Sequence, residues 1–378
     1  MRAATALLLA ACLPALSGVT RGLAAEQQDE QNPPAAPAPV QPNPAAPAPL
    51  GAPALDGELS LVSLARHVRP SVVAVEVRSP SRAPVTRHAV VVDAAGWLVL
   101  AGPTLGPKDT IVVRPRPDVA LPAVPVGSDA GTAITLLQIL GPPGDLRPLA
   151  FPPAEARKPL PPAPEPGSVV VMITSDGAVA RGRVRASERQ RVMVDAAHGV
   201  TERTTGLLEA AIASVSRDLG SPWVDGQGRC VGLLVGGVVD EAPGEEGVPA
   251  DIELRPEPVA AHAVPAAVVA LVWPLLRAHQ SLPRSRMGLR ARPAGEALRQ
   301  HVCGGCGGQE ITAVEAGGPA EQAGIEPEDL LVALDGHPLR AGASFADALL
   351  PYRPMDTVML TLVRHGERIE RGVVLAAR

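Results

Sequence analysis

The residues best spaced for chemistry are Cys303 and Cys306, a CxxC pair in a glycine-rich stretch that begins at His301. Such a pair can ligate zinc or act as a redox-active dithiol. Haem attachment would need a histidine directly after the pair, where the sequence has Gly307. Because no second CxxC completes a four-thiolate site, we expect a disulfide between Cys303 and Cys306, with no metal and no other cofactor.

The N-terminus follows the pattern of a secretory signal peptide. Arg2 precedes an apolar run from about Ala3 to Val19, and small residues follow at 24 and 25. We therefore expect residues 1–25 to be a signal peptide and the chain to reach the periplasm or cell envelope. Two alternatives stay open, because Cys12 ends a lipoprotein-type box and the run would also serve as an uncleaved anchor. The run is short for such an anchor, because crossing a bilayer takes about 20 apolar residues.

Composition limits the classes of function and fold. A formal net charge of -5 provides no broad basic surface for nucleic acid. Aromatic residues make up only 2% of the chain, so the core must be aliphatic, and 43 prolines argue against long helices. Residues 26–57, rich in Ala and Pro, predict a disordered linker.

Short β-branched runs separated by Gly and Pro occupy residues 58–280 and predict a barrel or sandwich. Cys230 lies in one of these apolar runs, where we expect a buried and inert thiol. Residues 284–378 alternate strand and helix signals, which predicts a separate α+β domain. The runs expected to form strands in the first domain are 71–77, 89–93, 97–100, 110–113, 134–139, 168–173, 191–194 and 229–235.

The second domain resembles a bacterial PDZ domain. The resemblance rests on 311–314, on 317–331 and on Leu334-Asp335-Gly336, where Pro319 suits a first helical turn and Gly324 a left-handed helix cap. It implies a groove that takes an extended peptide along a sheet edge. Burial in the core is the alternative for the helix residues. The resemblance assigns peptide binding to Met287, Gly288 and Leu289 in the carboxylate-binding loop, and to Phe345, Ala348 and Leu349 on the helix.

The first domain resembles the trypsin-like protease domain of the HtrA family, most strongly outside the catalytic positions. The fold class it implies is mainly β, a trypsin-like double β-barrel followed by the PDZ domain. Because HtrA relatives often trimerise through their protease domains, it also implies a homotrimer. The matching stretches, in the family's order, are 66–73, 126–129, 167–173, 179–184, 220–225 and 263–266.

The catalytic positions depart from the family's pattern. Serine proteolysis needs a hydroxyl nucleophile, an imidazole base and a carboxylate that orients the base. The matching positions hold Pro103 for the base, Ala133 for the acid and Leu219 for the nucleophile. Arg217 stands where a glycine shapes the oxyanion loop, and arginine pays a steric cost at positive φ. The resemblance therefore implies a degenerate pseudoprotease without catalytic residues.

A rearranged active site is the alternative interpretation. We expect the histidines to be ordinary surface residues, with His88 in a solvated turn before the strand at Ala89. The residues considered are Ser214, Ser216 and Ser221 as nucleophiles, and His67, His88 and His198 as bases.

The sequence thus predicts a non-catalytic binding or regulatory protein of the cell envelope. Its expected partners are C-terminal or extended segments of envelope proteins, with active HtrA relatives as further candidates. The alternative is a serine endopeptidase of envelope protein quality control that uses a rearranged site.

Overall fold

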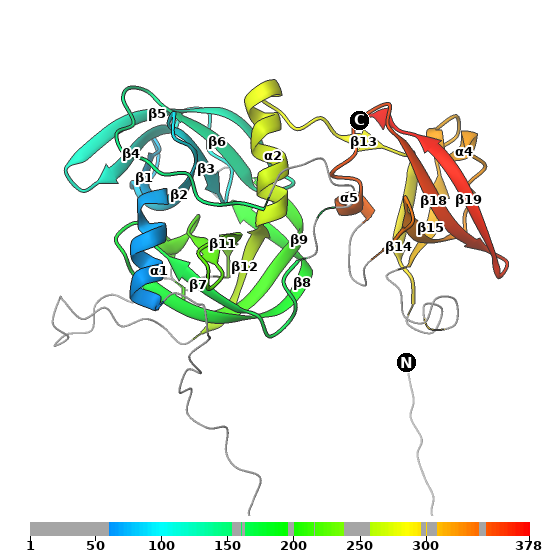
Figure 1. Cartoon of the computed structure of the whole chain (residues 1–378). Helices are drawn as coiled ribbons and strands as arrows, with labels where there is room; N and C mark the ends of the chain where they lie inside the picture. Colours follow the sequence, from blue (N-terminus) through cyan, green and yellow to red (C-terminus); the bar gives the residue numbers. More distant parts are fainter. Residues whose placement is uncertain are drawn as a thin grey trace, which may run out of the picture. The chain divides into compact units, whose positions relative to one another are not determined.

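Figure 1 shows the computed structural model, which describes residues 60–152, 160, 163–195, 200–214, 216–237, 258–295, 300, 308–339 and 345–378. The predicted signal peptide, linker and CxxC pair lie outside these ranges. Two closed six-stranded barrels and a further sheet account for most of the chain that is described. Within it, no helix has the length and apolarity needed to cross a membrane.

The first barrel has the strand order β1-β2-β3-β6-β5-β4. Alternate side chains point inward, and Val75, Leu98 and Leu137 are fully buried. Helix α1 (Leu61–Val68) precedes the barrel, and the Ser60 hydroxyl caps it. The strands are β1 (Val72–Arg78), β2 (Val85–Asp93), β3 (Trp97–Ala101), β4 (Thr110–Arg116), β5 (Val119–Asp129) and β6 (Ile134–Ile139).

The second barrel has the order β10-β11-β12-β9-β8-β7 and is followed by helix α2 (Ala266–His279). Its strands β8 and β9 form a long hairpin, and the run 191–194 that we expected as a separate short strand is part of β8. The strands are β7 (Val169–Ile173), β8 (Val179–Asp195), β9 (Val200–Ile212), β10 (Pro222–Val224), β11 (Cys230–Gly236) and β12 (Val259–Pro265).

A shared apolar layer joins the two barrels. It contains Val99 from β3, Val171 from β7 and Leu276 from α2, all almost fully buried. Side chains that point out of one barrel thus pack against the other, while the inward-pointing side chains of each barrel form its own core. The face between the barrels is therefore fixed by packing on both sides.

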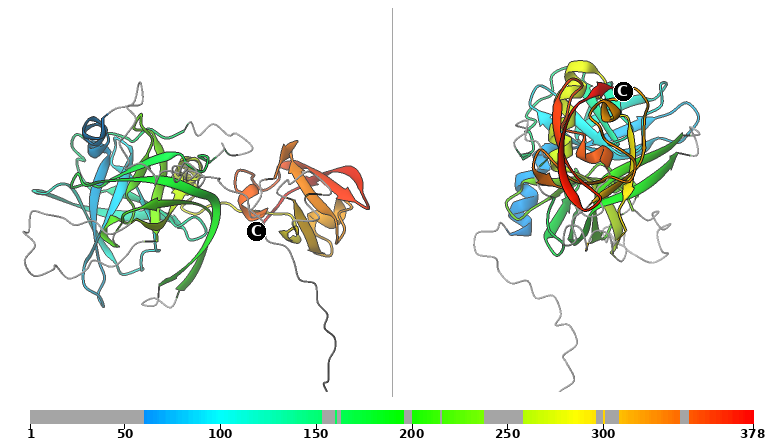
Figure 2. Two further views of the ribbon diagram at one scale, coloured as in Figure 1. Left: turned by 90° about the horizontal axis from the view of Figure 1, so that it is seen from below. Right: turned by 90° about the vertical axis from the view of Figure 1, so that its right-hand side faces the viewer.

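The C-terminal sheet runs β14-β15-β16-β18-β19, which leaves β14 at one edge. Figures 1 and 2 show β18 and β19 as a long hairpin. The Asp335-Gly336 turn has positive φ at both residues, as a tight turn of this sequence requires. The elements are β13 (Ser285–Arg286), β14 (Leu289–Pro293), β15 (Gln309–Val314), α4 (Pro319–Gln322), β16 (Leu330–Leu334), β17 (His337–Pro338), α5 (Phe345–Ala348), β18 (Thr357–Arg364), β19 (Glu367–Val374) and β20 (Ala376–Ala377).

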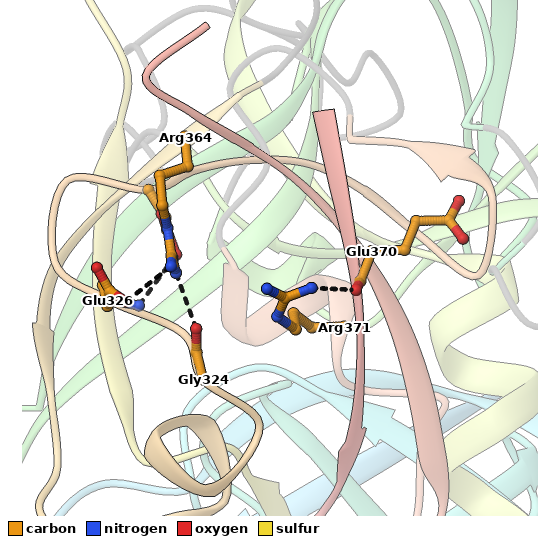
Figure 3. A network of polar contacts seen from close by, with 6 residues as sticks. Gly324, Glu326, Arg364, Glu370 and Arg371 are labelled. Carbon is orange, nitrogen blue, oxygen red and sulfur yellow. Dashed lines mark hydrogen bonds and ion pairs between the residues drawn. The ribbon is translucent and has the colours of Figure 1, made fainter. Parts of the chain in front are cut away.

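Arg364 ties the end of β18 to the turn that follows α4, as Figure 3 shows. Its guanidinium makes two bonds, of 2.7 and 2.8 Å, to the buried carboxylate of Asp329. It also donates to Glu326 Oε1 at 2.7 Å and to the Gly324 carbonyl at 2.8 Å. These bonds raise the pKa of Arg364. A buried carboxylate needs such a partner, so this contact fixes the turn.

The substitution Arg364→Met should destabilise this sheet. It leaves the Asp329 carboxylate buried, with its charge no longer compensated, at a cost of about 2–3 kcal/mol. Hydrogen exchange of β18 amides in the full chain measures the loss. Arg371→Met is the matched control, because the Arg371 guanidinium donates to the adjacent Glu370 carbonyl, and it should cost less than about 0.5 kcal/mol. Equal losses in the two variants would contradict this role for Arg364.

Candidate functional site

The ends of β3 and β6 bring the base and acid positions together. Ala101 of β3 pairs with Ile134 of β6, and the Gly102 amide donates to the Ala133 carbonyl at 2.9 Å. Ala133 adopts a φ of 55° and is 2% exposed. Pro103 follows Gly102 directly, so the positions of Pro103 and Ala133 are neighbours at one end of the first barrel.

The nucleophile position reaches the same place from the second barrel. Leu219 follows the 3-10 turn Ser216–Asp218, and its carbonyl accepts a hydrogen bond of 2.8 Å from the His88 amide on β2. The next residue, Gly220, lies so close to β2 that a Cβ there would stand 1.8 Å from the His88 carbonyl oxygen. It would also lie 3.5 Å from the Ala101 oxygen. The structure therefore gathers the three predicted positions where the two barrels meet.

The predicted peptide-binding residues gather in one apolar cluster of the C-terminal sheet. Met287 and Leu349 are buried at 2% and 7% exposure, so these two side chains belong to the core. Leu289, Phe345 and Ala348 pack half-buried against the same cluster. Each of the latter three keeps part of its surface exposed.

The loop before β14 is held by its carbonyl groups. The Met287 carbonyl accepts from Ala320 N at 2.8 Å, and the Gly288 carbonyl accepts from Glu315 N at 2.7 Å. Among the residues that the structure describes, the Met287 and Gly288 amides find no acceptor. Gly288 has a φ of 73°, which a glycine adopts without strain. The loop thus presents backbone amides beside an edge strand, which is the geometry that captures a peptide end.

Comparison with known proteins identifies this arrangement. The family described as PDZ domain matches residues 310–364. The HtrA-type protease AlgW with tripeptide is 17% identical, covers 85% of this chain and 98% of its own, and has a TM-score of 0.60. AlgW with decapeptide is 18% identical, covering 85% and 99%, with a TM-score of 0.55.

The serine endoprotease from Yersinia pestis is 19% identical, covers 85% of this chain and 98% of its own, and has a TM-score of 0.52. The chain has the fold of an HtrA-type protease with a PDZ domain. This confirms the predicted trypsin-like double β-barrel followed by an α+β PDZ domain. A search of curated protein sequences finds no match.

Pro103, Ala133 and Leu219, the residues that we predicted at the triad positions, carry no titrating group. The Pro103 carbonyl accepts a hydrogen bond of 3.0 Å from Arg87 Nη1. A proline, an alanine and a leucine can neither take a proton nor attack a carbonyl carbon. Chemistry of the triad type would have to come from other residues.

The backbone amides of residues 219–221, in the predicted oxyanion loop, donate to carbonyl groups of the chain itself. Leu219 N donates to Ser216 O at 3.4 Å, Gly220 N to Leu234 O at 2.8 Å and Ser221 N to Asp218 O at 3.0 Å. Arg217 lies within the 3-10 turn and avoids positive φ. Amides that already bond to carbonyl groups are not aimed at a substrate oxyanion.

The alternative nucleophiles differ in accessibility. Ser214 and Ser221 are fully buried, and Ser214 Oγ donates to the Gly237 carbonyl at 3.4 Å. Ser216 is half-buried in the 3-10 turn. His67 is exposed on α1. His198 lies outside the described residues.

His88 is not the solvated turn residue that we expected. Strand β2 begins at Val85, so His88 lies inside it, paired with Ala74 of β1 and 5% exposed. The prediction failed because the polar residues before Ala89 concealed the start of the strand. His88 Nδ1 lies 3.0 Å from Ser175 Oγ and 3.4 Å from the Ser175 amide nitrogen, which donates to it.

The turn that carries Ser175 also holds a carboxylate, Asp176. Partial burial raises the pKa of Asp176, but the bonds it accepts from the Thr174 hydroxyl and the Ala178 amide, with His88 nearby, leave that pKa below its usual range. Sequence reasoning missed this serine–histidine contact, because the two residues lie far apart along the chain and in different barrels. The one signal in the sequence was that the polar residues before the apolar run at Ala89 could already belong to the strand.

Of the cysteines discussed above, the structure describes Cys230. Cys230 is buried with a free thiol, as expected, and burial raises the pKa of that thiol. The predicted disulfide pair Cys303 and Cys306 lies outside the described residues. Within the described ranges, no three His, Cys, Asp or Glu side chains lie close enough together to hold a metal ion.

The substitution Gly220→Ala should strongly destabilise the double barrel. A Cβ would overlap the His88 carbonyl at 1.8 Å in addition to the positive φ of 86°, and the forced displacement should cost at least about 3 kcal/mol. Urea unfolding followed by tryptophan fluorescence measures the loss, because all three tryptophans lie between residues 97 and 273.

Gly144→Ala is the control for this prediction. Gly144 has a φ of 72° but no atom within 4 Å of its Cβ position, so the same substitution should cost about 1 kcal/mol. Equal costs at the two glycines would show that the contact with His88 does not constrain the fold.

Proposed function

We propose that this chain is a non-catalytic peptide-binding protein of HtrA fold that works in the cell envelope. The observation that carries the proposal is the loop before β14, where the amides of Met287 and Gly288 lie next to a strand at the edge of the described sheet. A peptide that adds to β14 would gain backbone hydrogen bonds, and the half-buried Leu289, Phe345 and Ala348 would contact its apolar side chains. The double barrel would then act as a scaffold.

The relatives support a peptide as the ligand. Two of the similar structures are of AlgW with a decapeptide and with a tripeptide. We propose C-terminal or extended segments of envelope proteins as the partners of this chain, in line with the predicted signal peptide of residues 1–25. Assembly with active HtrA relatives is part of the same proposal.

The absence of catalysis is supported by three features together. Pro103, Ala133 and Leu219 carry no triad chemistry, the amide of Leu219 bonds to the Ser216 carbonyl, and Ser221 is buried. Each removes a separate requirement of acyl transfer, namely base and acid, oxyanion stabilisation, and an accessible hydroxyl.

One observation favours a second candidate, a serine endopeptidase with a rearranged site. Ser175 Oγ lies within hydrogen-bond distance of His88 Nδ1, which is how a hydroxyl nucleophile and its base meet. We rank it below the binding function because the Ser175 amide donates to the same imidazole nitrogen and competes with the hydroxyl for it.

Trimming the groove should weaken peptide binding. In the exported protein, Leu289→Ala and Phe345→Ala should each raise the Kd for a fluorescein-labelled decapeptide pool about fivefold, since each removes partly buried apolar contact area. Fluorescence anisotropy gives the Kd. Met359→Ala is the control, because Met359 is 42% exposed on β18, three strands from β14. The peptides of the pool end in Val, Leu or Phe. The proposed groove would be refuted if this pool did not bind, or if it bound all three variants with the same Kd.

A further inference from the structure

An ion pair stands directly beside the loop that would receive the peptide end. Arg286 Nη1 lies 3.0 and 2.8 Å from the two carboxylate oxygens of Glu315. The same guanidinium donates from Nε to the Ala377 carbonyl at 3.3 Å, so it is held on two sides. Glu315 Oε2 lies 3.1 Å from the position that a Cβ of Gly288 would occupy. The Glu315 carboxylate therefore lies next to the loop whose Met287 and Gly288 amides have no acceptor among the described residues.

This placement matters for the charge of an arriving peptide. A terminal carboxylate bound at the Met287 and Gly288 amides would lie near the Glu315 carboxylate and be repelled by it. The guanidinium of Arg286 is already engaged by Glu315. An internal segment of a protein brings only a neutral peptide group to the same amides and meets no such repulsion.

We propose that Glu315 is a specificity-determining residue of the peptide site, which lowers the preference for free C-termini and so favours internal extended segments. The inference rests on the proposed peptide-binding function and concerns its substrate class. Arg286 acts in the opposite direction, because it offsets the charge of Glu315. Both side chains are about half exposed, so the effect is moderate and salt-dependent.

The chain contains a matched pair for comparison. Arg292 of β14 and Glu310 of β15 form a similar two-bond ion pair, with distances of 3.1 and 2.9 Å. Arg292 pairs with Glu310 near the far end of β14 from the loop. Removing Glu310 thus changes the net charge of the same domain by the same amount without changing the neighbourhood of Gly288.

The test compares one decapeptide pool, ending in Val, Leu or Phe, with a free carboxylate and with an amidated end. The measured quantity is the ratio of the two Kd values, by fluorescence anisotropy in the exported protein. Glu315→Gln should raise the preference for the free carboxylate about threefold to fivefold at low salt, and 1 M salt should remove most of the gain. Arg286→Gln should lower that preference, and Glu310→Gln should leave it unchanged.

The outcomes separate the two proposals. If the pool binds tightly and neither Glu315→Gln nor Glu310→Gln changes the ratio of the two Kd values, the role of Glu315 is overturned and peptide binding stands. Equal gains in both variants would show that only net charge matters, which also overturns it. If neither form of the pool binds, the proposed function fails, and this inference fails with it.

Discussion

The close approach of Gly220 to the His88 carbonyl is the contact on which the rest of the double barrel depends. It brings the segment before β10 against β2 without a side chain between them, and the His88 amide bonds to the Leu219 carbonyl in the same place. The ends of β3 and β6 meet beside it through Gly102 and Ala133. The three positions that we predicted for the triad therefore lie together where the barrels meet, and they hold Pro103, Ala133 and Leu219.

We propose that the two domains divide structural and binding roles. In the barrels, backbone amides at the predicted catalytic loop donate to carbonyl groups of the barrels themselves, as those of Leu219, Gly220 and Ser221 do. The PDZ domain leaves backbone groups unspent at one edge, while the Arg364–Asp329 contact keeps the turn after α4 fixed. Under the proposed function, the fixed turn and the edge strand β14 would together receive an extended peptide.

Much of this could be predicted from the sequence, because glycines and turns mark where the backbone must bend. Gly324 has a φ of 73° and Asp335-Gly336 forms a turn, as their residue types indicated. Side-chain contacts between distant segments could not be predicted. His88 lies on β2 of the first barrel and Ser175 in the turn between β7 and β8 of the second, so their contact depends on how the two barrels pack. No local pattern encodes these contacts.

The most direct test of the account is reaction of the purified full chain with a fluorophosphonate serine probe. Incubation with unfolded casein runs in parallel, with an active HtrA-type protease as positive control. The account predicts neither labelling nor cleavage. Labelling that maps to Ser175 or Ser221, with proteolysis abolished by the matching alanine variant, would contradict it and show that the barrels have rebuilt a working site.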